Sequence, residues 1–254
     1  MQSKNSKSVQ ICVFCYTVQM ATLYIVGTPI GNLDDITFRA VETLKSVDVI
    51  AAEDTRHTLQ LLNHLGIKKT LVSCRAQNEE KASAKIIEFL KNGHNVAYAS
   101  DAGTPGVSDP GAILAQTVRG AGFCVVPIPG PSAFATLVSV AGAGGKTLTF
   151  EGFLSPKPGR RRARVRELLL RGEAFVLYES PFRIVKLLSD IAEFAPERRI
   201  VVGRELTKIH EEIIDAKASE IFADFSQREK IQGEFAVFVS GVKNTQLSEE
   251  SADN

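Results

Sequence analysis

Short apolar runs alternate with amphipathic stretches through the first half of the chain. Runs of four to eight apolar residues are typical of buried strands, whereas apolar residues spaced three and four apart are typical of helices that cover a sheet. This pattern predicts strands at 22–27, 49–53, 70–74, 95–99 and 123–130, and helices at 34–47, 58–67, 80–93, 109–122 and 131–142. The alternation of the two kinds of element predicts a mostly parallel sheet.

Two of the predicted helices carry a signal at their start. Asp34 or Asp35 offers a side-chain oxygen that can cap the helix at 34–47. Pro110 falls in the first turn of the helix at 109–122, where the missing N–H of proline is tolerated. We therefore expect the two helices to begin at these residues.

The second half continues the alternation without a fixed repeat. It predicts strands at 148–155, 174–180, 199–206 and 234–241, and helices at 161–170, 182–195 and 218–227. The Gly-rich stretch AGAGGKT (141–147) lacks the GxxxxGK[ST] and GxGxxG spacings of phosphate-binding loops and is interpreted as a linker. The expected fold class is therefore α/β, with one α/β domain at 20–140 and another at 147–241.

Neither end of the chain follows this pattern. Residues 1–19 are interpreted as an upstream extension or a disordered tail, because Met20 directly precedes the first convincing strand and is a candidate for the true start. Residues 242–254 are polar and are expected to be disordered. No run of about 18 apolar residues occurs, so we expect no membrane-spanning helix.

The balance of charges limits the kinds of partner. The chain has 30 Lys and Arg against 29 Asp and Glu, for a formal net charge of +1. A general affinity for nucleic acid is therefore not indicated, and any such binding must come from a local patch. The histidines are scattered and have no metal-ligand spacing, so no metal site is expected.

Three loops rich in Gly and Pro follow predicted strands, at 27–35, 100–111 and 127–133. A fourth segment, AEDTR (52–56), also follows a strand. In an open α/β sheet, ligands bind at the carboxyl ends of the strands. These segments offer backbone N–H groups, hydroxyls and carboxylates but few cations, which argues against a triphosphate. The rim fits a ligand that is neutral or positively charged.

One basic run stands out in this nearly neutral chain. KPGRRRARVRELLLR (157–171) holds seven basic residues and a single acid. Arginine donates two parallel hydrogen bonds to phosphate, so a nucleic-acid backbone is the expected partner, although a solvated helix face is the alternative. The candidate RNA-binding residues are Lys157, Arg160, Arg161, Arg162 and Arg164.

A second mixed-charge stretch, RELTKIHEE (204–212), follows a predicted strand. Its acids and bases are compatible with a catalytic or substrate-binding rim. They are equally compatible with the salt-bridged start of a helix. The residue types alone do not choose between these two interpretations.

Segments in seven places resemble one family in the same order: LYIVGTPIGNLDDITFRAVETL, AAEDTRHT, SDAGTPGVSDPG, PIPGPSA, FEGFL, YESPFRI and GRELTKIHEE. The family is the ribosomal RNA small-subunit methyltransferase I group of the tetrapyrrole methylase superfamily, and the resemblance covers residues 22–241. It implies S-adenosylmethionine-dependent methylation of the ribose 2′-oxygen of a cytidine in the decoding region of 16S rRNA, either free or within the 30S subunit. It also implies two α/β domains with the cofactor in the cleft between them, a homodimer and a cytoplasmic enzyme.

The resemblance assigns cofactor contacts to the three loops. Asp101 is expected to orient the cofactor, and the glycines let it lie against the backbone. The segment SCRAQNEE (73–80) departs from the family, with Arg75 and Gln77 where histidines are expected in many relatives. The implied cofactor-binding residues are Thr28, Pro29, Asp101, Ala102, Gly103, Thr104, Pro105, Pro129, Gly130 and Pro131.

Methyl transfer to a ribose hydroxyl requires a group that accepts the proton. Candidates at predicted strand ends are Glu53, Glu179, Glu205 and Lys208, and of these we favour Glu205 and Lys208 as the catalytic pair. A lysine acts in this way only if its pKa is depressed. Two alternative functions are a tetrapyrrole C-methyltransferase, which would not need the basic run, and a non-catalytic ribosome-assembly protein, which would not need the cofactor rim.

Overall fold

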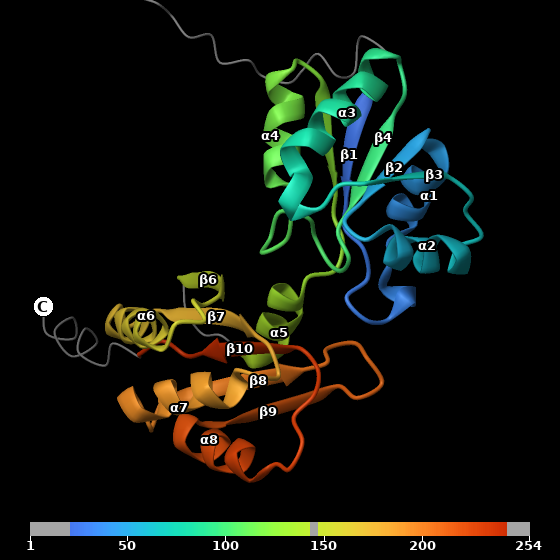
Figure 1. The fold of residues 1–254 in the computed structure, drawn as a ribbon. Helices are drawn as coiled ribbons and strands as arrows, with labels where there is room; N and C mark the ends of the chain where they lie inside the picture. The colour runs from blue at the N-terminus through green and yellow to red at the C-terminus, as the bar shows by residue number, and fades with distance from the viewer. Residues whose placement is uncertain (1–20, 143–146, 243–254) are drawn as a thin grey trace, which may run out of the picture. The chain divides into compact units, whose positions relative to one another are not determined.

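The computed structural model describes residues 21–142 and 147–242, which form two compact units (Figure 1). The first unit comprises residues 21–29 with Leu33–Gly130, and the second comprises Ile30–Asn32 with residues 131–242. The expectations for residues 1–19, for Met20, for residues 143–146 of the linker and for all but the first residue of the tail at 242–254 lie outside the described ranges. No helix in these ranges is long and apolar enough to cross a membrane.

A five-stranded parallel sheet, in the order β3-β2-β4-β1-β5, forms the centre of the first unit. Its strands are β1 (Thr22–Val26), β2 (Val49–Ala52), β3 (Thr70–Ser73), β4 (Val96–Ala99) and β5 (Cys124–Ile128). Every residue of β2 and β4 is buried, which is why their sequences are continuously apolar rather than alternating. All five strands match the prediction, and because they are parallel their carboxyl ends lie at one edge.

Helices cover both faces of this sheet. They are α1 (Phe38–Ser46), α2 (Thr55–His64), α3 (Glu79–Lys91) and α4 (Ala112–Gly120), with short 3-10 turns η2 (Leu33–Asp35) and η3 (Ala76–Asn78). Leu44 of α1 and Leu62 of α2 share one apolar cluster, and Ile86 of α3 and Leu114 of α4 share another on the opposite face. Figure 1 shows these two pairs on either side of the strands. A sheet covered in this way leaves its carboxyl edge open to a ligand.

The two helix starts that carried a sequence signal differ from the prediction. Asp34 and Asp35 lie in η2, and α1 is instead capped by Thr37, whose hydroxyl accepts a hydrogen bond from the Ala40 N–H at 3.1 Å. Helix α4 begins after Gly111, so Pro110 belongs to the preceding loop and not to the first helical turn. In both cases the loop at the carboxyl edge is longer than the sequence pattern indicates.

A mixed five-stranded sheet, in the order β6-β7-β10-β8-β9, forms the centre of the second unit. The strands are β6 (Leu148–Phe153), β7 (Ala174–Glu179), β8 (Arg199–Arg204), β9 (Glu212–Lys217) and β10 (Phe235–Val239). Only β6 and β7 pair in parallel, and the other neighbours are antiparallel. The edge strand β9 was not predicted, because EIIDAK alternates between half-buried and exposed positions and is rich in charge.

Helices α5 (Ala133–Ala141), α6 (Pro158–Leu170), α7 (Ile184–Phe194) and α8 (Ala218–Gln227) cover the second sheet. Residues of α6, α7 and α8 form one apolar cluster with alternate strand positions such as Phe175 and Leu177. Leu137 of α5 packs with Val176 and Phe238, which point to the other face. Contacts therefore place α5 in the second unit, whereas the expected boundary after residue 140 kept it with the first.

Candidate functional site

Four of the parallel strands deliver chemically active residues to the carboxyl edge of the first sheet. Thr28 follows β1, Glu53 follows β2, Asp101 follows β4 and Gly130 follows β5. The sheet order places β4 and β5 on either side of β1, so three of these loops are neighbours. The predicted convergence of the loops on one edge is therefore observed.

Two glycines bring the loops after β1 and β5 into direct contact. A Cβ atom added to Gly27 would lie 2.7 Å from Cα of Gly130, and one added to Gly130 would lie 2.8 Å from the carbonyl carbon of Gly27. Only glycine at both positions permits this approach. Gly27 was not predicted as a site residue, although it directly precedes Thr28 in the first Gly/Pro loop.

The loop after β4 is tied to the loop after β1. The Thr28 N–H donates to the Gly103 carbonyl at 2.8 Å, and the Gly103 N–H donates back to the Thr28 carbonyl at 3.1 Å. Gly103 has a φ of 78°, in the left-handed region that favours glycine. The loop that carries Ala102, Thr104 and Pro105 is therefore shaped by backbone bonds rather than free.

A buried carboxylate anchors the far end of the same loop. Glu79 accepts hydrogen bonds from the backbone N–H groups of Gly111 and Leu114, each at 2.9 Å. Gly111 has a φ of 124°, and an added Cβ would lie 2.8 Å from the ring of Tyr98. Glu79 thus serves the shape of the loop, whereas Arg75, where the sequence departs from the family, is exposed.

Three carboxylates gather beside this loop. Asp101 accepts a hydrogen bond from the Asp54 N–H at 2.9 Å, and Glu53 accepts one from the Asp101 N–H at 3.3 Å. Asp54 forms an ion pair with Arg56 at 2.7 Å, and this partner holds the pKa of Asp54 well below its usual range. Among the described residues, Glu53 and Asp101 have no ion-pair partner.

Glu53 has a raised pKa. Burial is the largest cause, and the negative charges of Asp101, Asp54 and Glu79 add to it, while the hydrogen bond from the Asp101 N–H opposes it. Glu53 and Asp101 thus lie close together without an ion pair of their own among the described residues, while the Arg56 guanidinium, which pairs with Asp54, also interacts electrostatically with Asp101. The prediction of a rim poor in cations is confirmed around these two carboxylates.

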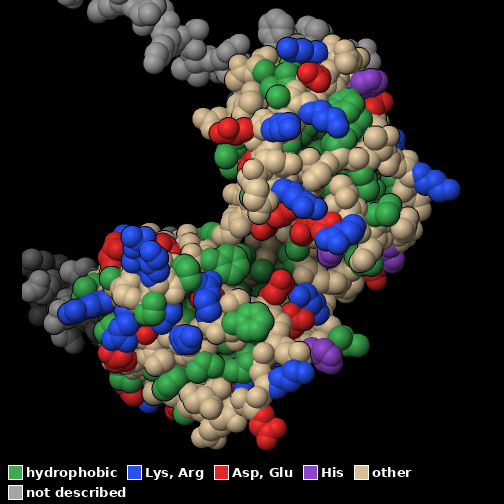
Figure 2. Space-filling model, viewed as in Figure 1, with side chains coloured by type: hydrophobic (Ala, Val, Ile, Leu, Met, Phe, Trp, Pro, Cys, Tyr) green, Lys and Arg blue, Asp and Glu red, His purple; other side chains and the backbone are tan. Residues whose placement is uncertain are grey.

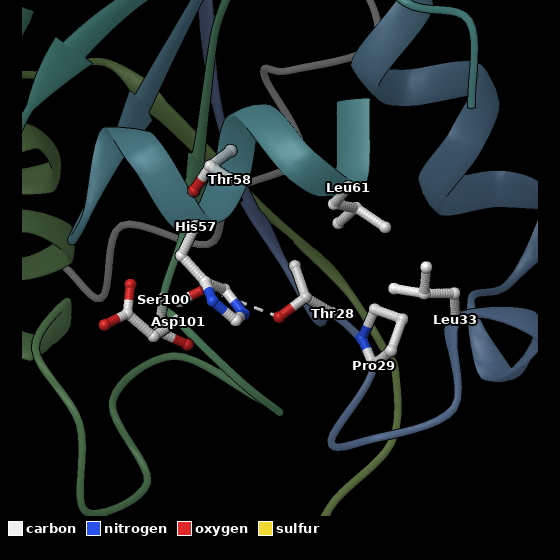
Figure 3. A pocket seen from close by; sticks show the side chains of 8 residues that line it. All are labelled: Thr28, Pro29, Leu33, His57, Thr58, Leu61, Ser100 and Asp101. Carbon is white, nitrogen blue, oxygen red and sulfur yellow. Dashed lines mark hydrogen bonds between the residues drawn. The ribbon is translucent and has the colours of Figure 1, made fainter. Parts of the chain in front are cut away.

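A small pocket opens at this edge, and Figure 3 shows the side chains that line it. They are Thr28, Pro29, Leu33, His57, Thr58, Leu61, Ser100 and Asp101. His57 lies beside Ser100 and Asp101 in this view. Asp54 caps α2 by accepting the Arg56 N–H at 2.9 Å, which places His57 in the first helical turn. Sequence reasoning missed His57, although it belongs to the quoted segment AAEDTRHT.

The remaining predicted cofactor residues lie on the loops that follow β4 and β5. Ala102, Gly103, Thr104 and Pro105 continue from Asp101, and Pro129 and Gly130 follow β5. Pro131 is the first residue of the second unit's main segment. The first unit thus brings nine of the ten predicted residues to one edge of its sheet.

The segment at 204–212 runs from the end of β8 through a loop at 205–211 to the start of β9, so its interpretation as a helix start is wrong. Lys208 Nζ lies 2.9 Å from Glu205 Oε1 and 3.0 Å from Glu234 Oε2. The Glu205 N–H donates to the Glu234 carbonyl at 2.9 Å, and the Glu234 N–H donates to Glu205 Oε1 at the same distance. Glu205 and Thr207 have φ values of 49° and 67°, so this loop stores backbone strain.

The pKa values of Glu205 and Lys208 shift in opposite directions. Burial raises the pKa of Glu205, but the hydrogen bonds from Lys208 and from the Glu234 N–H outweigh it, and the net pKa is lowered. Burial lowers the pKa of Lys208, but its bonds to Glu205 and Glu234 outweigh burial, and the net pKa is raised. Lys208 is therefore charged at neutral pH, which is opposite to the depressed pKa that a proton acceptor requires.

Most cations of the basic run are neutralised inside the second unit. Arg161 is buried and pairs with Asp190 at 2.6 Å. Arg162 pairs with Asp190 and Glu193, and Arg164 pairs with Glu151 and Glu167. The acidic partners lie up to 31 residues away, which is why the sequence pattern did not reveal them. Arg161 is not presented to a phosphate, contrary to the prediction.

The start of the basic run is different. Lys157 and Arg160 are exposed at the beginning of α6, and Arg166 is exposed further along it. Within the described residues none of these three forms an ion pair. Figure 2 shows basic and acidic side chains intermixed over the region where Figure 1 places α6. The positive surface is therefore smaller than the sequence predicts and centres on the first turn of α6.

Residues 22–221 match the model of the tetrapyrrole (corrin/porphyrin) methylases. The ribosomal RNA small subunit methyltransferase I of Borrelia garinii subsp. bavariensis is 50% identical over 219 residues, which is 86% of this chain and 98% of that protein. The proteins of the same name from Bacillus subtilis and Thermotoga maritima are each 44% identical, over 91% and 87% of this chain and 79% and 99% of theirs.

Solved structures share the fold at low identity. A cobalt precorrin-4 methyltransferase of cobalamin biosynthesis has a TM-score of 0.64 at 17% identity, covering 86% of this chain and 94% of its own. A uroporphyrin-III C-methyltransferase from Thermus thermophilus has a TM-score of 0.61 at 17% identity, covering 87% and 94%. With the matched residues and the closer relatives, the chain belongs to the tetrapyrrole methylase family and, within it, to the ribosomal RNA small subunit methyltransferase I group.

Proposed function

We propose that this chain transfers a methyl group from S-adenosylmethionine to the ribose 2′-oxygen of a cytidine in the decoding region of 16S rRNA. Membership of the methyltransferase I group supports the reaction. The observation that carries the proposal is the edge of the first sheet, where Glu53 and Asp101 lack a cation partner among the described residues. We further propose that the enzyme acts as a cytoplasmic homodimer.

The residues at this edge fit S-adenosylmethionine. The cofactor carries a sulfonium cation, an amino-acid end and an adenosine with ribose hydroxyls. Carboxylates without an ion pair of their own favour a positive ligand, and the backbone bonds between Thr28 and Gly103 hold the shape of the loop that carries Asp101. When bound, S-adenosylmethionine supplies a methyl group on a positive sulfur, which a nucleophilic oxygen can attack.

The chain's own residues then have four tasks. Asp101, held by the Asp54 N–H, orients the cofactor, while the bonds between Thr28 and Gly103 fix the loop around it. Alignment of this kind contributes up to roughly 7–11 kcal/mol to a two-reactant step. Of the favoured catalytic pair, Glu205 is ionised at neutral pH, so its carboxylate is the group that can accept the ribose proton. Lys208, which is charged, holds that carboxylate in place.

The RNA is expected to meet the second unit at the first turn of α6. Lys157 and Arg160 are the exposed cations there, and each is expected to contact a phosphate. Arg162 and Arg164 contact RNA in this proposal only where its phosphates displace the acidic side chains that pair with them.

Labelled S-adenosylmethionine and 30S subunits from a strain that lacks this protein test the reaction. The expected result is label at a 2′-O-methylcytidine in the decoding region, abolished by Asp101→Ala. Glu88→Gln, at an exposed acid of α3, is the control and is expected to leave the activity unchanged. Cofactor binding without label on rRNA would overturn the rRNA assignment and favour a small acceptor such as a tetrapyrrole.

A further inference from the structure

Two phenylalanines are exposed at the carboxyl edge of the parallel pair β6 and β7. Phe153 ends β6 and is 54% exposed, and Phe182 follows β7 and is 89% exposed. Because β6 and β7 are parallel, both side chains lie at the same edge of the second sheet. Two exposed aromatic rings at one edge of a sheet leave apolar area that a ligand can cover favourably.

The loop that carries Phe182 is held rigidly. Arg183 pairs with Glu179 at 2.7 Å and donates to the Leu154 carbonyl at 3.2 Å. Glu179 is fully buried and also accepts the Ser180 N–H at 2.8 Å. The buried carboxylate thus holds Ser180 and Arg183, and Arg183 in turn ties the loop to Leu154, the residue that follows β6. The exposure of Phe182 therefore belongs to a fixed loop.

Phe153 is fixed in a similar way. Its ring lies edge-to-face against Tyr178, with 5.7 Å between the ring centroids. Tyr178 in turn packs against Phe150 at 5.0 Å, within the apolar layer around α5. Phe153 thus has one side supported by protein while about half of its surface faces solvent.

Two cations without an ion pair among the described residues, Lys157 and Arg160, lie four and seven residues after Phe153. Lys157 occupies the N-cap position of α6 and Arg160 lies in its first turn, and both are exposed. Figure 2 shows hydrophobic and basic side chains side by side on the face of the unit that carries α6 and α7 in Figure 1. Aromatic rings that stack on bases, beside cations that contact phosphates, are the chemistry that recognises single-stranded RNA.

We propose that Phe182 and Phe153 form a stacking platform for an unpaired nucleotide of the RNA substrate, with Lys157 and Arg160 bound to the adjoining phosphates. This rests on the proposed function, since it concerns how that substrate is held. Glu179 and Arg183 are positioning residues that act through Phe182. The platform explains how a protein with a net charge of only +1 selects RNA: stacking supplies affinity that charge does not.

The test compares Phe182→Ala with Leu170→Ala. Leu170 is 78% exposed and lies at the opposite end of α6, so it is a control for the loss of an exposed apolar side chain. Binding of a fluorescein-labelled single-stranded RNA that contains the decoding-region cytidine is measured by anisotropy. Phe182→Ala is expected to weaken binding about 5- to 150-fold, the range for loss of one stacked base, while Leu170→Ala leaves it unchanged.

Two further variants separate stacking from other causes. Phe182→Trp retains a ring and is expected to restore the affinity, whereas Phe182→Leu retains apolar area without a ring and is expected to behave like alanine. Cofactor affinity measured by calorimetry is expected to remain unchanged in all of them. Equal RNA binding by Phe182→Ala and the wild type overturns the platform. A dimer that dissociates with Phe182→Ala also overturns it, because the surface would then join two copies.

Methyl transfer to 30S subunits is measured with the same variants. Wild-type transfer, with a raised KM and an unchanged kcat for Phe182→Ala, supports the platform and the reaction together. Wild-type transfer with an unchanged KM for this variant overturns the platform alone. RNA binding that depends on Phe182 without any wild-type transfer to rRNA contradicts the proposed reaction and leaves the platform supported.

Discussion

Glu53 in the first unit and Glu205 in the second each directly follow the last residue of a strand, yet their pKa values shift in opposite directions. Burial raises the pKa of Glu53, and neighbouring carboxylates raise it further. Burial also acts to raise the pKa of Glu205, but the ammonium of Lys208 at 2.9 Å reverses the outcome. The position at a strand end is the same, and the presence of a cation makes the difference.

This comparison distinguishes carboxylates that are available to a positively charged cofactor from a carboxylate whose charge is matched by a lysine of the same chain. Glu205 spends its charge on Lys208, and the pair holds a loop whose backbone is strained at Glu205 itself. Glu53 and Asp101 have no such partner among the described residues, so their charge is available to a ligand. A pocket for a positive cofactor is expected to lack its own cation, because an internal ion pair would compete with the ligand.

The largest effect is expected from placing a cation at the carboxyl edge of the first sheet. Glu53→Lys reverses one charge at the carboxyl edge beside Asp101. Unit charges about 4 Å apart interact by roughly 1–4 kcal/mol between bulk water and an effective dielectric of 20. We expect S-adenosylmethionine to bind about a hundredfold more weakly, as measured by calorimetry.

Glu88→Lys is the matched control for this variant. It makes the same change of net charge on the exposed face of α3, in the same unit. Its affinity for the cofactor is expected to stay within about twofold of the wild type, because exposed charges are screened beyond about 10 Å. Equal cofactor binding by both lysine variants would show that the charge of Glu53 does not contribute to the cofactor site.

The second prediction removes the cation from the other cluster. Lys208→Met leaves Glu205 and Glu234 facing each other without a positive partner. Because the pair is only partly buried, we expect the free energy of unfolding to fall by about 1 kcal/mol. Urea denaturation measures this change, and it is expected to shrink at high salt.

Lys45→Met provides the comparison for Lys208→Met. Lys45 pairs with Glu42 at 3.1 Å on α1, but both side chains are mostly exposed. Its loss is expected to change the free energy of unfolding by less than about 0.5 kcal/mol. If the two methionine variants unfold alike, Lys208 does not clamp the loop, and a direct role in the reaction becomes the better explanation.

Much of the fold follows from the sequence pattern because burial and periodicity are local properties. The strand at 22–27 and the helix at 218–227 were placed within one residue of their observed bounds. β9 was missed because an edge strand buries few side chains, and its charged residues hide the alternation. Thr37 was missed as a cap because two aspartates nearby are equally good cap formers.

The site was predictable in outline for a different reason. Gly/Pro loops after parallel strands meet at one edge whatever the side-chain details, so Thr28 and Asp101 were located correctly at that edge. Pairing between distant residues is not encoded locally. Asp190 lies 29 residues from Arg161, and nothing in the basic run indicates that this guanidinium is buried against it. His57 required knowledge of where α2 begins.

The smallest expected effect concerns how two matched substitutions change the free energy of unfolding as the pH varies. Some carboxyl groups have a higher pKa in the folded state than in the unfolded state. Such a group adds stability at a pH below its unfolded-state pKa, and this contribution is lost as the pH rises through its folded-state pKa. Glu53 is of this kind, so ionised Glu53 destabilises the fold at neutral pH. A carboxyl with a lowered folded pKa adds stability above its unfolded pKa and loses it as the pH falls through the folded value, and Glu205 is of this kind.

Glu53→Gln and Glu205→Gln are therefore expected to change stability with opposite signs at pH 7. Glutamine keeps the carbonyl oxygen that accepts the Asp101 N–H, so Glu53→Gln removes the charge and retains the bond. We expect it to raise the free energy of unfolding, and Glu205→Gln to lower it, each by about 1 kcal/mol or less. Urea denaturation between neutral pH and the ordinary glutamate pKa of 4.5 measures both. The stabilisation by Glu53→Gln is expected to vanish as the pH falls through the raised pKa, whereas the destabilisation by Glu205→Gln persists to 4.5 and disappears only below it. Effects of the same sign at pH 7 would show that neighbouring charge does not distinguish the two strand ends.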